Sequence, residues 1–169
     1  WSSVLLLVTM VVAFLAVRAA GGEPWFGLTV ASFIGWQPMV GLSMTRVNND
    51  VLAILLGTVC CWLLALVATG GPTVRRVAWL GVVIGLSISN KYFGIVFLPL
   101  AWMAIWMNRD SVPAGERWSR IGLVTLLAAV IGAAWFIRTN LGSIDWNPAR
   151  DVSQGLSHAV TSIPHVLAL

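Results

Sequence analysis

Residues 80–107 form one apolar stretch that is interrupted near its middle by the polar group Ser89-Asn90-Lys91. A single helix over this stretch would be about 42 Å long, more than the roughly 30 Å thickness of the hydrocarbon core of a bilayer. Two helices that turn at residues 90–92 would each be about 21 to 24 Å long, too short for a full crossing. A lysine in the middle of a membrane-spanning helix is costly, and irregular backbone at that depth persists where it is buried in protein or borders water. We therefore expect a hairpin of two short helices that holds Lys91 in a recessed polar cavity.

The composition also indicates a membrane protein. Hydrophobic residues make up 59% of the chain and charged residues 9%, whereas a soluble domain carries about 25% charged residues. The mean hydropathy is +0.89. The formal net charge of +4 matches the lysine and arginine excess of membrane loops. Because the longest basic run is Arg75-Arg76, we expect no nucleic-acid partner. Cys60 and Cys61 are adjacent and match no metal-binding spacing.

Apolar runs separated by breaker residues and charges predict an all-α fold: a polytopic transmembrane helical bundle of about six to seven helices, in a single domain over residues 1–169. The predicted helices cover about residues 2–17, 25–44, 51–68, 77–89, 93–107 and 121–137. We expect Pro38 to kink the second helix, and residues 108–120 and 138–158 to form polar loops. The chain opens on Trp1 without a basic leader and stops inside a seventh apolar run, so we expect a fragment of a larger protein.

Successive passes through a membrane place the loops alternately on its two sides. The loops of one side would carry Arg18, Arg75, Arg76, Arg109, Arg117 and Arg120, and those of the other side Arg46, Lys91, Arg138 and Arg150. The positive-inside rule assigns the first set to the cytoplasm and the second set to the exterior.

Two polar positions on the exterior side are the main candidates for a functional site. Lys91 offers a compact positive charge for a phosphate or pyrophosphate group, or it is a loop lysine that reaches water. Asp50 closes the polar run that precedes the third predicted helix. It either caps that helix or faces the same cavity as Lys91, where it would orient a substrate or a divalent metal.

Three further residues on the exterior side are candidates for substrate binding. Arg46 either binds a phosphate or extends from the interface to water. Tyr92 either hydrogen-bonds a ligand or anchors the chain at the interface. Arg138 opens a polar tail that could close over a substrate, and that equally resembles a solvated loop with turns. His158 and His165 lie seven positions apart without a carboxylate partner at ligand spacing, which is weak support for a metal site.

Small residues recur along one face of the predicted helix over residues 77–89. Gly81, Gly85 and Ser89 follow one another at intervals of four. Such a stripe lets a neighbouring helix approach closely. It would serve ordinary helix packing or, in addition, hold Lys91 rigidly in place.

Two of these segments resemble a known family of enzymes. The run Arg46-Val-Asn-Asn-Asp-Val-Leu-Ala53, and the run Gly85-Leu-Ser-Ile-Ser-Asn-Lys-Tyr92 that continues to Leu98-Pro99, resemble the GT-C superfamily of integral-membrane glycosyltransferases. The closest likeness is to the branch of the protein O-mannosyltransferases and the lipid A aminoarabinose transferases. The likeness covers roughly residues 25–146, and Asn90 stands where the family has Thr or Ser.

The resemblance implies an enzyme of the bacterial cytoplasmic membrane that moves a sugar from a polyprenyl-phosphate donor to an acceptor on the exterior face. By position, Asp50 would match an acidic residue that in relatives helps bind a metal or arrange the site, and Lys91 would match the lysine near the lipid phosphate. The main catalytic carboxylate of the family lies in a first exterior loop, which we expect upstream of Trp1. The residues leave two alternatives open: a multi-pass transporter or flippase, and a non-catalytic membrane subunit.

Overall fold

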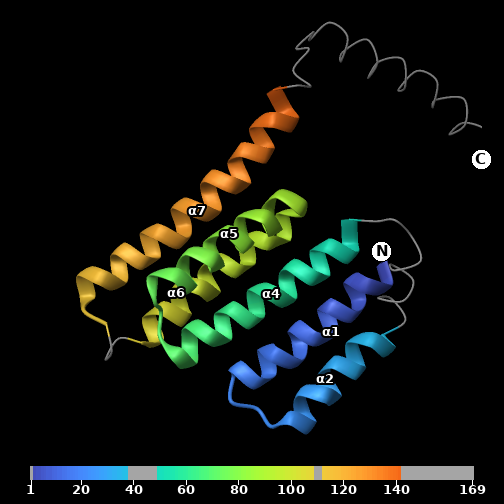
Figure 1. Cartoon of the computed structure of the whole chain (residues 1–169). Coiled ribbons are helices and arrows are strands. Elements are labelled where there is room, and N and C mark those ends of the chain that lie inside the picture. The colour runs from blue at the N-terminus through green and yellow to red at the C-terminus, as the bar shows by residue number, and fades with distance from the viewer. Residues whose placement is uncertain (1, 38–48, 109–111, 142–169) are drawn as a thin grey trace, which may run out of the picture. The chain divides into compact units, whose positions relative to one another are not determined.

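The computed structural model describes residues 2–37, 49–108 and 112–141 (Figure 1). These residues form six α-helices, one 3-10 helix and no strand, which confirms the all-α prediction. The elements are α1 (Ser2–Ala19), α2 (Pro24–Trp36), α4 (Asn49–Gly70), α5 (Val74–Asn90), the 3-10 helix η1 (Tyr92–Val96), α6 (Phe97–Met107) and α7 (Ala114–Leu141). Contacts divide the chain into two units, Trp1–Phe136 and Ile137–Leu169, and the helix packing belongs to the first.

Among the described helices, two are long and apolar enough to cross a membrane. They are the segment Asp50–Gly70 of α4 and the segment Ala114–Ala134 of α7. Two further apolar segments, Ser3–Ala19 and Tyr92–Met107, are shorter. At 1.5 Å per residue, the 22 residues of α4 extend about 33 Å, close to the thickness of a bilayer core.

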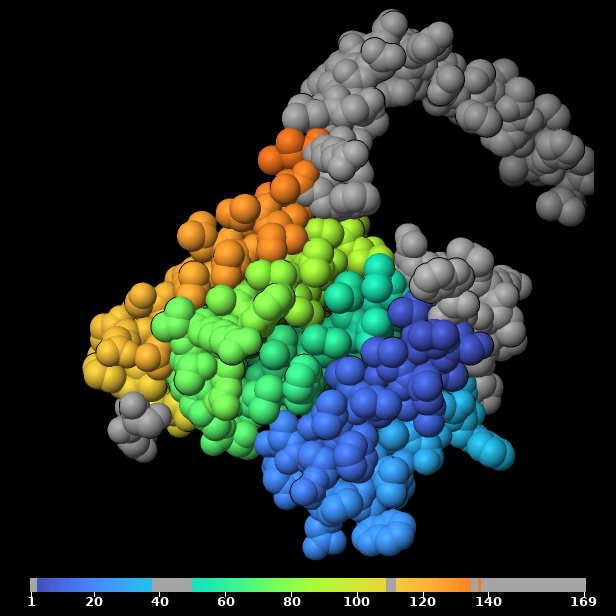
Figure 2. Space-filling model, in the orientation of Figure 1, coloured from blue at the N-terminus to red at the C-terminus, as the bar shows by residue number. Residues whose placement is uncertain are grey.

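The core of the first unit lies among four helices, α4 to α7. Each contributes small or branched side chains from one face, and these side chains are almost completely buried. The members are Cys60, Leu63 and Val67 of α4, Val77, Leu80 and Ile84 of α5, Ala101, Ala104 and Ile105 of α6, and Val124 and Ala128 of α7. On the other side of α4, α1 packs against both α4 and α2. In Figure 2 the atoms of α1, coloured dark blue, lie between those of α2 and α4.

The small-residue stripe of α5 is the surface on which α7 packs. A Cβ atom at Gly85 would lie 2.7 Å from the Cβ of Ile131, and one at Gly81 would lie 3.0 Å from the carbonyl oxygen of Val124. The hydroxyl of Ser89, the third member, donates to the carbonyl of Ile131 at 3.2 Å. The packing interpretation of the stripe is therefore confirmed, and the stripe is covered within the chain itself.

The predicted break at Lys91 is also confirmed. α5 ends at Asn90, and Lys91 has extended backbone angles, φ −150° and ψ 137°. The chain then turns through η1 into α6, which runs back beside α5 and α4 (Figure 1). The two arms of the hairpin, Val74–Asn90 and Tyr92–Met107, are each about 25 Å long.

Three predicted boundaries need correction. α2 ends at Trp36 and Gln37 is extended, as expected of a residue that precedes proline, while the predicted kink at Pro38 and the rest of the predicted helix to residue 44 lie outside the described residues. Residues 114–120 of the predicted loop 108–120 are the first two turns of α7. The predicted loop at 138–158 begins too early, because α7 continues to Leu141.

The early start of α7 has a clear electrostatic origin. The carbonyl of Pro113 accepts the first hydrogen bond, from the backbone N–H of Arg117, at 3.1 Å. Glu116 lies in the first turn, where the helix dipole favours a carboxylate. Its carboxylate pairs with Arg120 one turn later at 2.6 Å. These charged residues, which the sequence analysis assigned to a loop, therefore stabilise the beginning of a helix.

Candidate functional site

The candidate site lies where the hairpin of α5 and α6 meets the start of α4. The ammonium of Lys91 forms an ion pair and hydrogen bond with the Oδ1 of Asp50. The two residues are 41 positions apart in the sequence. Asp50 lies in the first turn of α4, so its carboxylate is stabilised both by the ammonium and by the helix dipole. We call this end of the bundle the Lys91 end.

The backbone around Lys91 is fixed by hydrogen bonds on both sides. Its N–H donates to the carbonyl of Ser87 at 2.8 Å, and its carbonyl accepts from the N–H of Gly94 at 3.0 Å. Gly94 lets η1 lie directly against the last turn of α5, since a Cβ there would come within 2.5 Å of the backbone nitrogen of Ile88. The position of Lys91 therefore depends on a glycine three residues further along the chain.

The same turn is tied to α7. The hydroxyl of Ser89 donates to Gly85 at 2.9 Å within α5 and to Ile131 of α7 at 3.2 Å. This contact joins the residue two positions before Lys91 to the longest described helix. The cation therefore stands on a turn held by three elements: α5, η1 and α7.

The pair is accessible to a ligand. The side chain of Lys91 is 42% exposed and that of Asp50 is 32% exposed. Ion pairs at this level of exposure contribute about 0 to 1 kcal/mol to stability. A phosphate group that binds Lys91 can therefore replace Asp50 as its partner at small cost.

The remaining predicted site residues stand as follows. Tyr92 begins η1 next to Lys91, and its side chain is 76% exposed. Arg46 lies outside the described residues, as do the tail from residue 142 onward, His158 and His165. The backbone of Arg138 belongs to α7, and its side chain is outside the described set. The structure thus brings Asp50 and Lys91 together, and Tyr92 follows Lys91 directly in the chain.

The described residues provide no metal centre. Within residues 2–37, 49–108 and 112–141, no three His, Cys, Asp or Glu side chains gather closely enough to hold an ion. The carboxylate of Asp50 contacts a lysine, and a divalent cation would have to displace that ammonium. The metal role of Asp50 stays a prediction, because the residues that precede Asn49 lie outside the described set.

The opposite end of the bundle holds a second set of polar contacts, which the sequence did not reveal. The guanidinium of Arg76 donates to carbonyls in the last turn of α4, those of Leu66 at 3.2 Å and of Gly70, and to the carbonyl of Gly71 just beyond the helix at 3.1 Å. The amide of Asn108 donates to Val67 at 3.1 Å and Ala68 at 3.3 Å. These donors satisfy carbonyls that a helix end leaves without partners.

This opposite end also gathers most of the described arginines, and we call it the arginine-rich end. It comprises the C-terminal ends of α1, α4 and α6 and the beginnings of α2, α5 and α7 (Figure 1). The hydroxyl of Thr69 donates to Ala19 at 2.9 Å and so joins α1 to α4 at this end. The arginines here are Arg18, Arg75, Arg76, Arg117 and Arg120. The two charge sets of the predicted topology therefore lie at opposite ends, as far as their members are described.

Comparison of this chain with protein families, curated proteins and solved structures found no match.

Proposed function

We propose that this chain is part of a multi-pass membrane glycosyltransferase of the GT-C type, which transfers a sugar from a polyprenyl-phosphate donor to an acceptor on the exterior face of the membrane. The observation that carries the proposal is the ion pair of Lys91 and Asp50 at the break between two short helices. Both residues belong to the segments that resemble the family. Their contact joins the two segments in space across 41 positions of sequence.

The surface of the helices supports the placement in a membrane. Large apolar side chains on every helix remain exposed, among them Leu7 at 62%, Phe33 at 71% and Leu126 at 61%. A soluble monomer rarely exposes contiguous apolar surface on this scale, whereas a lipid-facing surface requires it. Hydrocarbon surrounding α1, α2 and α4–α7 would solvate these side chains.

The distribution of charge supports an orientation. The arginine-rich end would face the cytoplasm by the positive-inside rule, and the Lys91 end would face the exterior. Ser89 is level with Ile131 of α7, and residues 132–136, which continue α7 in the same unit, are apolar. The Lys91 turn would therefore lie more than one helical turn, about 5 Å, below the point where α7 leaves the hydrocarbon.

A recessed cation at this depth suits the phosphate of a lipid-linked donor. The polyprenyl chain would lie in the bilayer, and the phosphate would meet Lys91 just below the interface. In the transfer, the bond between the anomeric carbon and the phosphate oxygen breaks, and a bond from the acceptor oxygen to that carbon forms. Lys91 would stabilise the charge that develops on the departing polyprenyl phosphate.

Asp50 would have a different role. While Lys91 binds the phosphate, the carboxylate of Asp50 would orient the acceptor. The proton of the acceptor hydroxyl must pass to a general base. We expect that base in the exterior loop that the resemblance places before Trp1, so residues 1–169 would supply donor binding rather than the base.

One observation bears on the alternatives. A non-catalytic subunit would use the small-residue stripe of α5 to assemble with a partner, but α7 already covers Gly81 and Gly85. A flippase would also need a phosphate site near Lys91, and would differ in moving the lipid without breaking the sugar bond. A transfer assay distinguishes the two.

The proposal is tested by transfer from a polyprenyl-phosphate sugar in membranes that contain the protein at its natural length. Lys91→Ala should abolish transfer and leave the amount of inserted protein unchanged. The matched control is Arg75→Ala, which removes an exposed cation at the opposite end and should leave transfer intact. Unchanged turnover in Lys91→Ala would refute the role of Lys91.

A further inference from the structure

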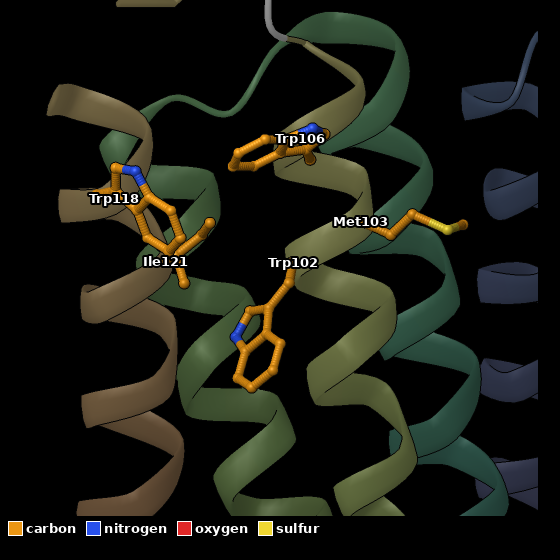
Figure 3. Close-up of a pocket in the computed structure, with 5 residues that line it drawn as sticks. All are labelled: Trp102, Met103, Trp106, Trp118 and Ile121. Atoms are coloured by element: carbon orange, nitrogen blue, oxygen red, sulfur yellow. The ribbon is translucent and has the colours of Figure 1, made fainter. Parts of the chain in front are cut away.

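An apolar groove lies between α6 and α7 near the arginine-rich end. Its volume of about 390 Å³ is within the range of small-molecule sites. The groove is lined by Trp102, Met103, Trp106, Trp118 and Ile121. Figure 3 shows Trp102 and Trp106 on one helix and Trp118 and Ile121 on the other, facing the space between α6 and α7. The lining is almost entirely apolar, so the groove suits a hydrocarbon chain.

Trp102 forms one wall of the groove, and Trp106 and Trp118 form its rim toward the arginine-rich end. The indole N–H of Trp102 donates to the hydroxyl of Thr125 at 3.0 Å, which fixes this ring between α6 and α7. One turn closer to the helix ends, Trp106 and Trp118 meet edge to face, with their centroids 5.8 Å apart. Tryptophan at the end of a membrane span marks the level of the lipid headgroups. The groove therefore runs from headgroup level into the apolar part of the bundle.

A cation stands at the rim. The guanidinium of Arg117 lies over the ring of Trp106, 5.2 Å from its centroid, a cation–π contact. Its Nε is buried and has no hydrogen-bond partner in the structure. Arg120, on the same helix, is already paired with Glu116 at 2.6 Å. Among the described residues, Arg117 makes no comparable ion pair, so its terminal N–H groups offer donors to an anion at the rim, whereas the buried Nε lies out of reach.

We propose that this groove binds an anionic phospholipid, with an acyl chain between α6 and α7 and the headgroup phosphate on Arg117. The planar guanidinium matches the geometry of a phosphate, and basic pockets between membrane helices on the cytoplasmic side commonly bind acidic headgroups. The inference rests on the membrane placement and orientation of the proposed function, and is independent of sugar transfer.

The charge of the site favours this occupant over a zwitterionic lipid. At the arginine-rich end, the described arginines outnumber the described acidic residues Glu23 and Glu116. A phosphatidylcholine headgroup would bring its own cation close to Arg117, whereas phosphatidylglycerol brings net negative charge. Both headgroups offer the same phosphate to Arg117, so the preference comes from repulsion of the choline cation at this basic end, and we expect it to be roughly tenfold.

Native mass spectrometry of the detergent-purified protein, with added dioleoylphosphatidylglycerol or dioleoylphosphatidylcholine, tests the inference. The expected result is roughly tenfold tighter retention of phosphatidylglycerol, a preference that Arg117→Gln abolishes. The matched control Arg75→Gln removes an exposed arginine at the same end and should keep the preference. Trp118→Ala, at a side chain that is 62% exposed, should weaken retention of both lipids.

The outcomes separate the explanations. Retained preference in Arg117→Gln, or an equal loss in Arg75→Gln, would overturn the inference. The inference would also be overturned if the protein formed a dimer that Trp118→Ala dissociates and showed no lipid preference, because the groove would then bind a second copy of the chain. If Arg117→Gln does not fold, the lipid preference is measured on the wild type by quenching of tryptophan fluorescence with acyl-brominated phosphatidylglycerol and phosphatidylcholine. Equal quenching by the two lipids would contradict the inference. Lys91→Ala should retain the preference, so failure of sugar transfer remains distinguishable.

Discussion

Gly94→Ala is expected to destabilise the fold and to displace Lys91. The new Cβ would lie 2.5 Å from the nitrogen of Ile88 and 2.6 Å from the carbonyl carbon of Ser87, distances that real Cβ atoms essentially never show. Both neighbours are backbone, so η1 has to move away from α5. Overpacking of this kind costs about 1 to 3 kcal/mol, and the reduced flexibility of the unfolded chain returns about 0.4 to 1 kcal/mol. We expect a net loss of about 1 to 2 kcal/mol.

A matched substitution should have the opposite sign. Gly122 lies in α7, and an added Cβ there meets no atom within 4 Å. Gly122→Ala should therefore stabilise the protein by about 0.5 to 1 kcal/mol, because alanine is the better helix former. Reversible unfolding in mixed detergent micelles of increasing sodium dodecyl sulfate content measures both changes in the free energy of unfolding. If Gly94→Ala stabilised the protein as much as Gly122→Ala, the proposed packing of η1 against α5 would be wrong.

Three further predictions concern the two ends of the bundle. Arg76→Met should lower the free energy of unfolding by about 1 to 3 kcal/mol, because the last carbonyls of α4 lose their donor, whereas Arg75→Met should change it by less than about 0.5 kcal/mol; equal losses would contradict the capping role. A double-mutant cycle of Asp50→Asn and Lys91→Met in the same unfolding assay should give a coupling energy of about 0.2 to 1 kcal/mol that decreases with salt, and a coupling above about 3 kcal/mol would indicate a buried pair instead. In a cysteine-free background, Asn90→Cys should react with an impermeant thiol reagent from the exterior, and labelling from the cytoplasm alone would reverse the orientation.

The break at Lys91 could be predicted from the sequence because it depends on local information. The apolar stretch is too long for one span and too short for two, and it has a polar group in its middle. Few geometries satisfy these conditions. The stripe of Gly81, Gly85 and Ser89 likewise indicated a helix contact, although not that α7 would be the partner. Both features follow from spacing along a single segment.

Features that depend on distant partners could not be predicted. Arg76 looks like an ordinary loop charge, and its role appears once the end of α4 lies beside it. The role of Asn108 likewise becomes evident from its contacts with the carbonyls of α4. The early start of α7 was missed because Glu116 and Arg120 lower the local hydropathy, even though their spacing of four is the spacing of a helical ion pair.

The aromatic groove was also not predicted, although its signal is present in the sequence. Trp102 and Trp106 are four apart, as is expected of neighbours on one face of a helix. Trp118 and Ile121 have the corresponding spacing on α7, but that helix was predicted to begin at residue 121. The wrong boundary therefore concealed the second wall of the groove.

The central claim is that Lys91 binds the phosphate of a lipid-linked donor, and equilibrium binding of a polyprenyl phosphate to the purified protein tests it most directly. Lys91→Ala should weaken binding by roughly tenfold or more, since a charge-assisted contact is lost, while Arg75→Ala should bind as the wild type does. Equal affinity in the wild type and in Lys91→Ala would contradict the claim.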